Sequence, residues 1–73
     1  MVVEDKQLIC DLLLKAYQAT RQFNDLVALN YEKRHEDLEI VTAVFSNGYK
    51  REINVSLDSG WAMIRDITKH LDG

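Results

Sequence analysis

Two runs rich in β-branched and aromatic residues flank the pair Asn47-Gly48 in the stretch Leu38–Leu57, which reads LEIVTAVFSNGYKREINVSL. A two-residue hairpin turn needs positive φ at both central positions, and Asn tolerates this conformation while Gly adopts it freely. The stretch therefore predicts a β-hairpin closed by Asn47-Gly48.

The turn sets the register of the hairpin, because side chains alternate between its two faces. One face is mostly apolar, and we expect helices to cover it. Its pairs are Ser46–Tyr49, Val44–Arg51, Thr42–Ile53, Ile40–Val55 and Leu38–Leu57. On the other face Val41, Ala43 and Phe45 stand opposite polar residues. We expect these three side chains to lie uncovered within one chain and to form an interface.

The sequence before the hairpin predicts a long helix from Asp5 to Leu29, which follows a loosely held start at residues 1–4. No Gly or Pro interrupts this segment, and its apolar residues recur at the three- and four-residue spacing of a helix. A second apolar row includes Leu12 and Leu26, which we expect to contact another copy of the chain. The polar run Asn30–Asp37 then forms a connector. The main stripe comprises Ile9, Leu13, Ala16, Thr20, Phe23 and Val27.

A second, shorter helix follows the hairpin and ends near His70, with Asp58 or Ser59 as its N-cap. Its inner stripe comprises Ile64, Ile67 and Leu71, extended by Trp61 or Met63. The whole chain, residues 1–73, is thus predicted to be a single α+β domain of order α-β-β-α, with both helices on one face of the hairpin.

A two-stranded hairpin is marginally stable by itself and exposes both of its edges. We therefore expect a homodimer or higher oligomer to complete this sheet.

Composition restricts the classes of function. The formal charge is −3 and acidic and basic residues are interleaved, which disfavours binding to nucleic-acid backbones. Cys10 is the only cysteine, which suits a reducing compartment. The chain has neither an 18-residue apolar run nor a signal-peptide pattern, so we expect a cytoplasmic protein without a membrane span.

No catalytic or metal-binding pattern is recognisable. Cys10 lies among apolar residues and is predicted to be a buried small side chain. His35 and His70 are far apart in sequence and lack partners at metal-ligand spacing. Phosphate-binding glycine motifs are also absent. The sequence therefore predicts a protein that is not an enzyme and has neither cofactor nor metal.

Two clusters are candidates for binding a ligand or partner. Tyr49, Lys50 and Arg51 follow the turn and combine an aromatic ring with two cations, which suits a nucleotide or an acidic surface. Ser59-Gly60 begins the second helix, where free N–H groups bind anions. The alternative interpretations are a solubilised turn for the first cluster and a simple N-cap for the second.

The C-terminal half combines Val44, Tyr49, Ile53, Asn54, Val55, Asp58, Ser59, Ala62, Ile64 and Asp66. Through these residues it resembles small uncharacterised proteins encoded by phages and prophages of Gram-positive bacteria. The resemblance implies an accessory protein in the host cytoplasm that binds a host defence or regulatory factor stoichiometrically and inhibits it. One alternative is an oligomeric sponge that sequesters a signalling nucleotide between adjoining subunits. Another is a DNA-binding regulator that uses Lys50, Arg51 and Arg65.

Overall fold

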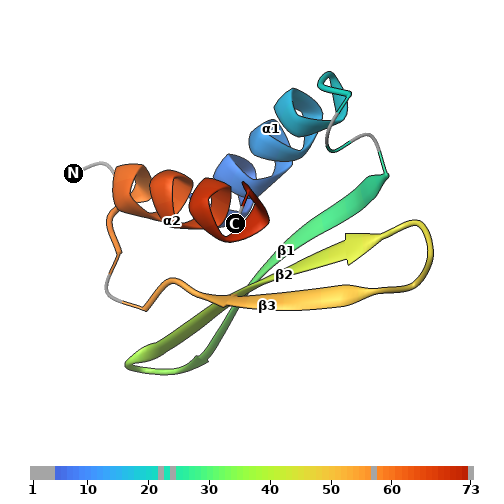
Figure 1. The fold of residues 1–73 in the computed structure, drawn as a ribbon. Helices are drawn as coiled ribbons and strands as arrows, with labels where there is room; N and C mark the ends of the chain where they lie inside the picture. The colour runs from blue at the N-terminus through green and yellow to red at the C-terminus, as the bar shows by residue number, and fades with distance from the viewer. Residues whose placement is uncertain (1–4, 22, 24, 57, 73) are drawn as a thin grey trace.

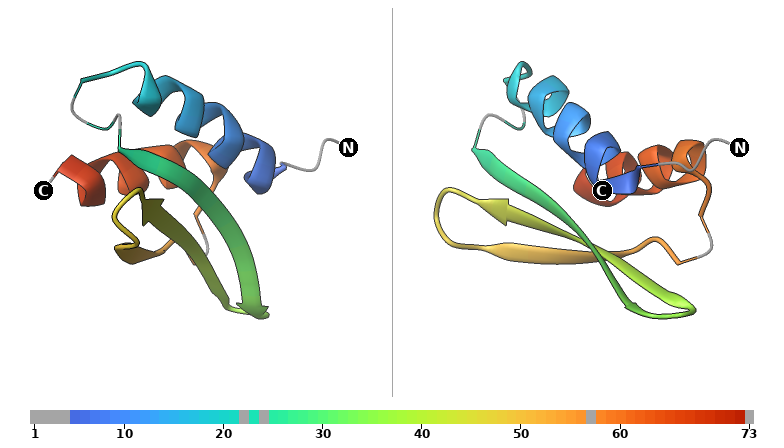
Figure 2. Two further views of the ribbon diagram at one scale, coloured as in Figure 1. Left: turned by 90° about the vertical axis from the view of Figure 1, so that its right-hand side faces the viewer. Right: turned by 180° about the vertical axis from the view of Figure 1, so that it is seen from behind.

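A computed structural model describes residues 5–21, 23, 25–56 and 58–72. Two helices cover one face of a three-stranded antiparallel sheet and leave the other face open (Figure 1; Figure 2). This arrangement confirms the α+β class and the placement of both helices on one side of the hairpin, and it adds a strand. The elements are α1 (Lys6–Gln18), β1 (Leu26–His35), β2 (Leu38–Phe45), β3 (Lys50–Asn54) and α2 (Gly60–Asp72).

The hairpin of β2 and β3 lies where the sequence predicts it, but its loop has three residues instead of two. The Gly48 N–H donates to the Phe45 carbonyl over 2.9 Å, and the Phe45 N–H donates to the Tyr49 carbonyl over 2.9 Å. Gly48 has a φ of 86°. This is the pattern of a turn followed by a left-handed glycine bulge.

The extra loop residue shifts the register by one position and turns every side chain of β2 to the opposite face. Val41 pairs with Ile53 and Ala43 with Arg51. Val41 and Ala43 are 0% exposed in the core, and Phe45 packs against the core partly buried. The expectation that Val41, Ala43 and Phe45 lie uncovered is therefore wrong.

The first helix ends at Gln18, and the predicted helix end and connector form β1 instead. A register shift between Leu26 and Ala28 explains the helical spacing in this segment. In a regular strand Leu26 and Leu29 would face opposite sides, but the bulge returns both to the core. Leu26, which we expected to contact another copy, is 0% exposed inside the domain.

The second helix matches its prediction closely. The Ser59 hydroxyl accepts a hydrogen bond from the Ala62 N–H at 3.2 Å, which confirms Ser59 as the N-cap. Met63 and Ile67 are fully buried between α2 and the sheet. Of the two residues expected to extend the stripe, Met63 does so, whereas Trp61 is 76% exposed.

Because β1 adds a third strand to the hairpin within one chain, the sheet does not need a second chain to become stable. The oligomer itself stays a prediction. The expected loose start at residues 1–4 and the pairing of Leu38 with Leu57 fall outside the described residues. Within the described ranges, none of the helices has the length and apolar character needed to cross a membrane.

Candidate functional site

The predicted cluster at the hairpin tip is divided between the two faces of the sheet. Lys50 and Arg51 are consecutive strand residues, so their side chains point in opposite directions. Tyr49 precedes them, paired with Phe45 at the base of the loop, and is 57% exposed, with its ring centroid 5.8 Å from that of Phe45. The three side chains therefore do not grip one ligand together.

Arg51 lies on the helix side of the sheet and reaches the end of α2. Its Nη1 donates to the His70 carbonyl at 2.7 Å. The last carbonyls of a helix lack partners within the helix, so this bond satisfies one of them. It also holds the guanidinium group in a fixed position.

A surface hollow of about 470 Å³ lies beside this arginine, lined by Arg51, Asp66, Lys69 and His70. The three α2 residues share one side of the helix because they are spaced three and four apart. Arg51 and Lys69 bring positive charge to the hollow, and Asp66 brings one negative charge. The spacing of these α2 residues is a signal that the sequence already carries, but only the structure places Arg51 beside them.

Ser59 and Gly60 lie at the other end of α2 from Arg51. Ten residues of helix separate Gly60 from His70, which is about 15 Å at the rise of an α-helix. The Ser59 hydroxyl is engaged as the N-cap, and Gly60 is buried. Within one chain the structure does not bring Ser59-Gly60 together with Arg51.

The free edge of β3 lies next to the hollow. Two hydrogen bonds at the ends of the β2–β3 ladder show which residues of β3 bond to β2. The Phe45 N–H donates to the Tyr49 carbonyl, and the Val55 N–H donates to the Glu39 carbonyl. Because antiparallel bonding alternates, the N–H and C=O groups of every second residue of β3 point away from β2. In the part of the chain that the structure describes, these outward groups have no hydrogen-bond partner. They belong to Lys50, Glu52 and Asn54.

Side chains of α1 close the opposite edge of the sheet along the first part of β1, between Leu26 and Tyr31. The Gln7 amide accepts from the Tyr31 N–H at 2.9 Å and donates to the Leu29 carbonyl at 3.2 Å. The Gln18 amide donates to the Leu26 carbonyl at 2.9 Å. These amides occupy backbone groups that a neighbouring strand would otherwise bond.

A partly buried polar cluster fastens α1 to the same side of the sheet. Lys6 Nζ lies 2.6 Å from Glu39 Oε1, and the Tyr31 hydroxyl donates to the same oxygen. This hydrogen bond to Glu39 is the main cause that raises the pKa of Tyr31 to about 12, with burial as a further cause. Glu39 therefore has a structural role between helix and sheet.

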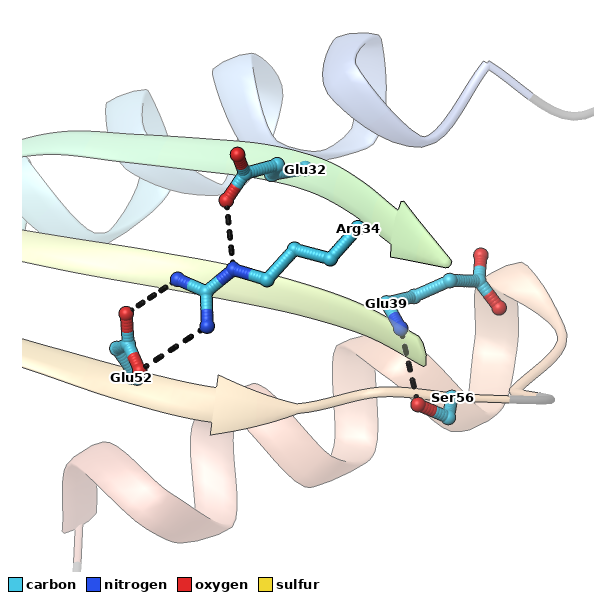
Figure 3. Close-up of polar contacts among 5 residues, drawn as sticks. All are labelled: Glu32, Arg34, Glu39, Glu52 and Ser56. Atoms are coloured by element: carbon cyan, nitrogen blue, oxygen red, sulfur yellow. Dashed lines mark hydrogen bonds and ion pairs between the residues drawn. The ribbon is translucent and has the colours of Figure 1, made fainter. Parts of the chain in front are cut away.

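The open face of the sheet carries an arginine held by two glutamates (Figure 3). Arg34 Nε lies 2.8 Å from Glu32 Oε2, and its terminal nitrogens donate to both carboxylate oxygens of Glu52. The Arg34 guanidinium lowers the pKa of Glu52 and has its own pKa raised. The cluster spans the open face from β1 to β3, beside the apolar residues Ile40 and Val44 of β2.

The titratable groups considered for catalysis are not arranged for it. Cys10 is 0% exposed, and burial first and Asp11 second raise the pKa of its thiol to about 11, so the thiol stays protonated. His35 and His70 lie on different elements and are exposed. Among the described residues, no group of three or more His, Cys, Asp or Glu side chains is placed to hold a metal ion.

Asp58 lies just before α2 in a desolvated position. Burial and the neighbouring Asp66 carboxyl raise the pKa of Asp58. Its Oδ2 atom is buried and has no hydrogen-bond partner among the described residues. Asp58 was one of two candidates for the N-cap, and the Ser59 hydroxyl takes that role.

The outer side of α2 presents an exposed tryptophan beside an arginine. Trp61 and Arg65 are four residues apart and therefore lie on the same side of the helix. Trp61 is 76% exposed and the Arg65 side chain is 70% exposed. On α1, the side chains of Leu8 and Leu12 are also exposed. Leu12 was expected to contact another copy of the chain, and that contact stays a prediction. The sequence pattern placed Trp61 beside the core because it lies next to the apolar stripe of α2.

Comparisons with models of protein families, with curated proteins and with solved structures each find no match to this chain. The resemblance to phage and prophage proteins therefore stays a prediction.

Proposed function

We propose that this chain is a protein-interaction module that binds its partner stoichiometrically through the Trp61–Arg65 side of α2. The exposure of Trp61 carries the proposal, because 76% of the largest apolar side chain in the protein is left in water. Tryptophan and arginine are the residue types that most often dominate the energy of protein interfaces. An accessory protein that inhibits a host defence or regulatory factor would act through such binding.

The chemistry of this surface indicates the partner surface. The indole of Trp61 would be buried in an apolar pocket of the partner, and Arg65 would pair with a carboxylate at the rim of that pocket. Arg65 Nε is 4.0 Å from Asp66 Oδ1, a long contact that leaves most of its donors available. We therefore favour an acidic protein surface with an apolar pocket. An anionic membrane or nucleic acid fits less well, because the whole protein has a charge of −3.

The test uses Trp61 as its own reporter, since it is the only tryptophan in the chain. A displayed library of random dodecapeptides is selected on the intact protein and counter-selected on the bare support, so that the Trp61→Ala variant is kept for the binding measurement. The enriched peptides should combine an aromatic or aliphatic residue with Asp or Glu. They should also shift Trp61 emission to shorter wavelength, because binding removes the indole from water.

Two variants measure the contributions of the surface, and one serves as a control. Trp61→Ala should weaken binding of an enriched peptide by about 30-fold or more, as expected for an interface hot spot. Arg65→Glu should weaken it by about tenfold. Tyr49→Ala removes another exposed aromatic ring and should leave binding unchanged. The proposal fails if peptides bind Trp61→Ala as tightly as the original protein, or if only lipid vesicles or duplex DNA shift the emission.

A further inference from the structure

We propose that the free edge of β3 and the hollow under α2 form one groove that binds an extended peptide segment bearing a single carboxylate. This surface adjoins the Trp61–Arg65 side of α2, because Lys69 is four residues after Arg65, but it includes neither Trp61 nor Arg65 and does not depend on them. The proposal rests on two independent observations, which are the outward backbone groups of β3 and the charged hollow beside them.

The backbone of β3 is suited to strand addition. The N–H and C=O groups of Lys50, Glu52 and Asn54 point away from β2 and have no partner within the described residues. An extended peptide beside an edge strand bonds such alternate groups and continues the sheet. On the β1 edge this position is taken by Gln7 and Gln18, so peptide addition is directed to β3.

The hollow lies on the same side of the molecule as this edge. The hydroxyls of Thr68 on α2 and Tyr17 on α1 are hydrogen-bonded, so Thr68 marks the side of α2 that faces α1. Asp66, Lys69 and His70 are turned about 100–200° around the helix from Thr68. They therefore lie on the side away from α1, and Arg51 of β3 meets them at the hollow.

A peptide paired with β3 would direct every second side chain toward the hollow, because strand side chains alternate. Arg51 has five N–H donors in a planar fork, and the His70 carbonyl uses one of them. Lys69 adds a second cation. Both favour a carboxylate, while Asp66 in the same wall disfavours a second negative charge. The hollow thus fits the carboxylate of an Asp or Glu side chain better than a doubly charged phosphate.

The neighbouring peptide side chains would point to the open face of the sheet. There Lys50 and Glu52 flank the edge, and Glu52 is already bound to Arg34. This face therefore offers polar contacts of both signs, next to Val44, which is paired with Lys50. We expect it to tolerate short polar or β-branched side chains such as Thr and Val.

The experiment is an NMR titration of the ¹⁵N-labelled protein with capped nonapeptides of alternating Thr and Val. Each carries one Glu, moved through the odd positions across the panel, and a second panel carries Gln instead. At least one Glu peptide should bind with Kd below about 1 mM and slow the exchange of the Lys50, Glu52 and Asn54 amide protons. The matching Gln peptide should bind about tenfold more weakly.

Variants separate the backbone contribution from the charge contribution. Lys50→Pro removes one outward N–H without touching the ladder to β2 and should abolish binding. Arg51→Gln and, separately, Lys69→Gln should lower the affinity for the Glu peptide toward that of the Gln peptide. Lys69→Gln keeps the bond of Arg51 to α2, so it remains informative if Arg51→Gln fails to fold. Lys33→Gln, on β1, is the charge control and should change nothing.

The two proposals are distinguished by Trp61→Ala, which should bind the Glu peptides normally. The groove proposal is overturned if no Glu peptide changes the three edge amides at about 1 mM, or if Glu and Gln peptides bind equally. It is also overturned if AMP, as a phosphate probe, shifts the signals of Arg51 and Lys69 while the peptides do not. That result would indicate a nucleotide site instead.

Discussion

The two edges of the sheet are treated in opposite ways. The edge along β1 is closed between Leu26 and Tyr31 by Gln7 and Gln18, whose amides bond the backbone of β1 as a fourth strand would. The short edge along β3 keeps its outward N–H and C=O groups. The difference teaches that a small protein can use its own helix to protect one edge and leave the other for recognition.

The open edge still has protection against indiscriminate pairing. β3 has only five residues, and Lys50, Arg51 and Glu52 are charged. Short length and charge, lysine above all, are common defences of edge strands. A partner strand must therefore match this charge pattern, so the edge favours specific binding over non-specific aggregation.

The largest effect is expected from opening the closed edge. Gln7→Ala combined with Gln18→Ala removes the three hydrogen bonds to β1, along with an exposed bond from Gln7 to Asp11, and should lower the free energy of unfolding by about 2–4 kcal/mol, at roughly 1 kcal/mol for each bond to β1. Alanine is the better helix former, so the loss would come from the edge and not from α1. Urea unfolding measures the stability, and sedimentation velocity should detect new self-association. Unchanged stability and a single unchanged species would contradict the role given to these glutamines.

The stability of the protein should depend on pH through Tyr31, which lies on the closed side of the sheet. Below pH 10 Tyr31 is protonated in the folded and unfolded chains alike. Above pH 10 the unfolded chain loses this proton, while the folded chain keeps it up to its pKa of about 12. Stability should therefore fall from pH 10 to about 12.

Unfolding in urea at a series of pH values measures this slope, and Tyr31→Phe is the matched variant because it lacks the hydroxyl. The burial that raises the pKa of Tyr17 acts in the same direction and remains in that variant. An equal slope in Tyr31→Phe and the original protein would show that Tyr31 does not cause it.

Substitutions at Gly48, in the turn that places β3 beside β2, should lower the stability by a smaller amount. Gly48→Ala forces an alanine into a φ of 86° and should destabilise the protein by about 1 kcal/mol. A Cβ at this position meets no atom within 4 Å, so backbone conformation is the only cause. Gly48→Asn should be milder, because Asn tolerates positive φ. Thermal unfolding of both variants provides the measurement, and equal losses would argue against this explanation.

The smallest effect is expected on the open face. Arg34→Ala breaks the pairs with Glu32 and Glu52, which are exposed and screened by water. The midpoint of thermal unfolding should move little at physiological salt and less still at high salt. A large loss that persists in high salt would show that Arg34 does more than join two exposed carboxylates.

Sequence patterns predicted the hairpin, the second helix and a cap at Asp58 or Ser59 because local residues determine each of them, and the structure decides for Ser59. They did not distinguish a two-residue from a three-residue loop, since Asn47-Gly48 suits both. That single residue of register decides whether Val41 is core or surface. They also misread β1 as helix, because its bulge gives Leu26 and Leu29 the spacing of helical residues.

The candidate groove was only partly visible in the sequence. Arg51 stood out beside the turn, but its meeting with His70 depends on how α2 crosses the sheet. The role of Gln7 and Gln18 was invisible, because an amide that bonds a strand edge leaves no periodic pattern. Contacts between distant segments, rather than local preference, define both edges.

Amide hydrogen exchange measured by NMR tests the contrast between the two edges most directly. The Tyr31 amide proton, held by Gln7, should be protected like those of the inner ladder, and Gln7→Ala should release it. Along β3, Arg51 and Ile53 should be protected, while Lys50, Glu52 and Asn54 exchange rapidly. An unprotected Tyr31 amide, or uniform protection along β3, would contradict one closed and one open edge.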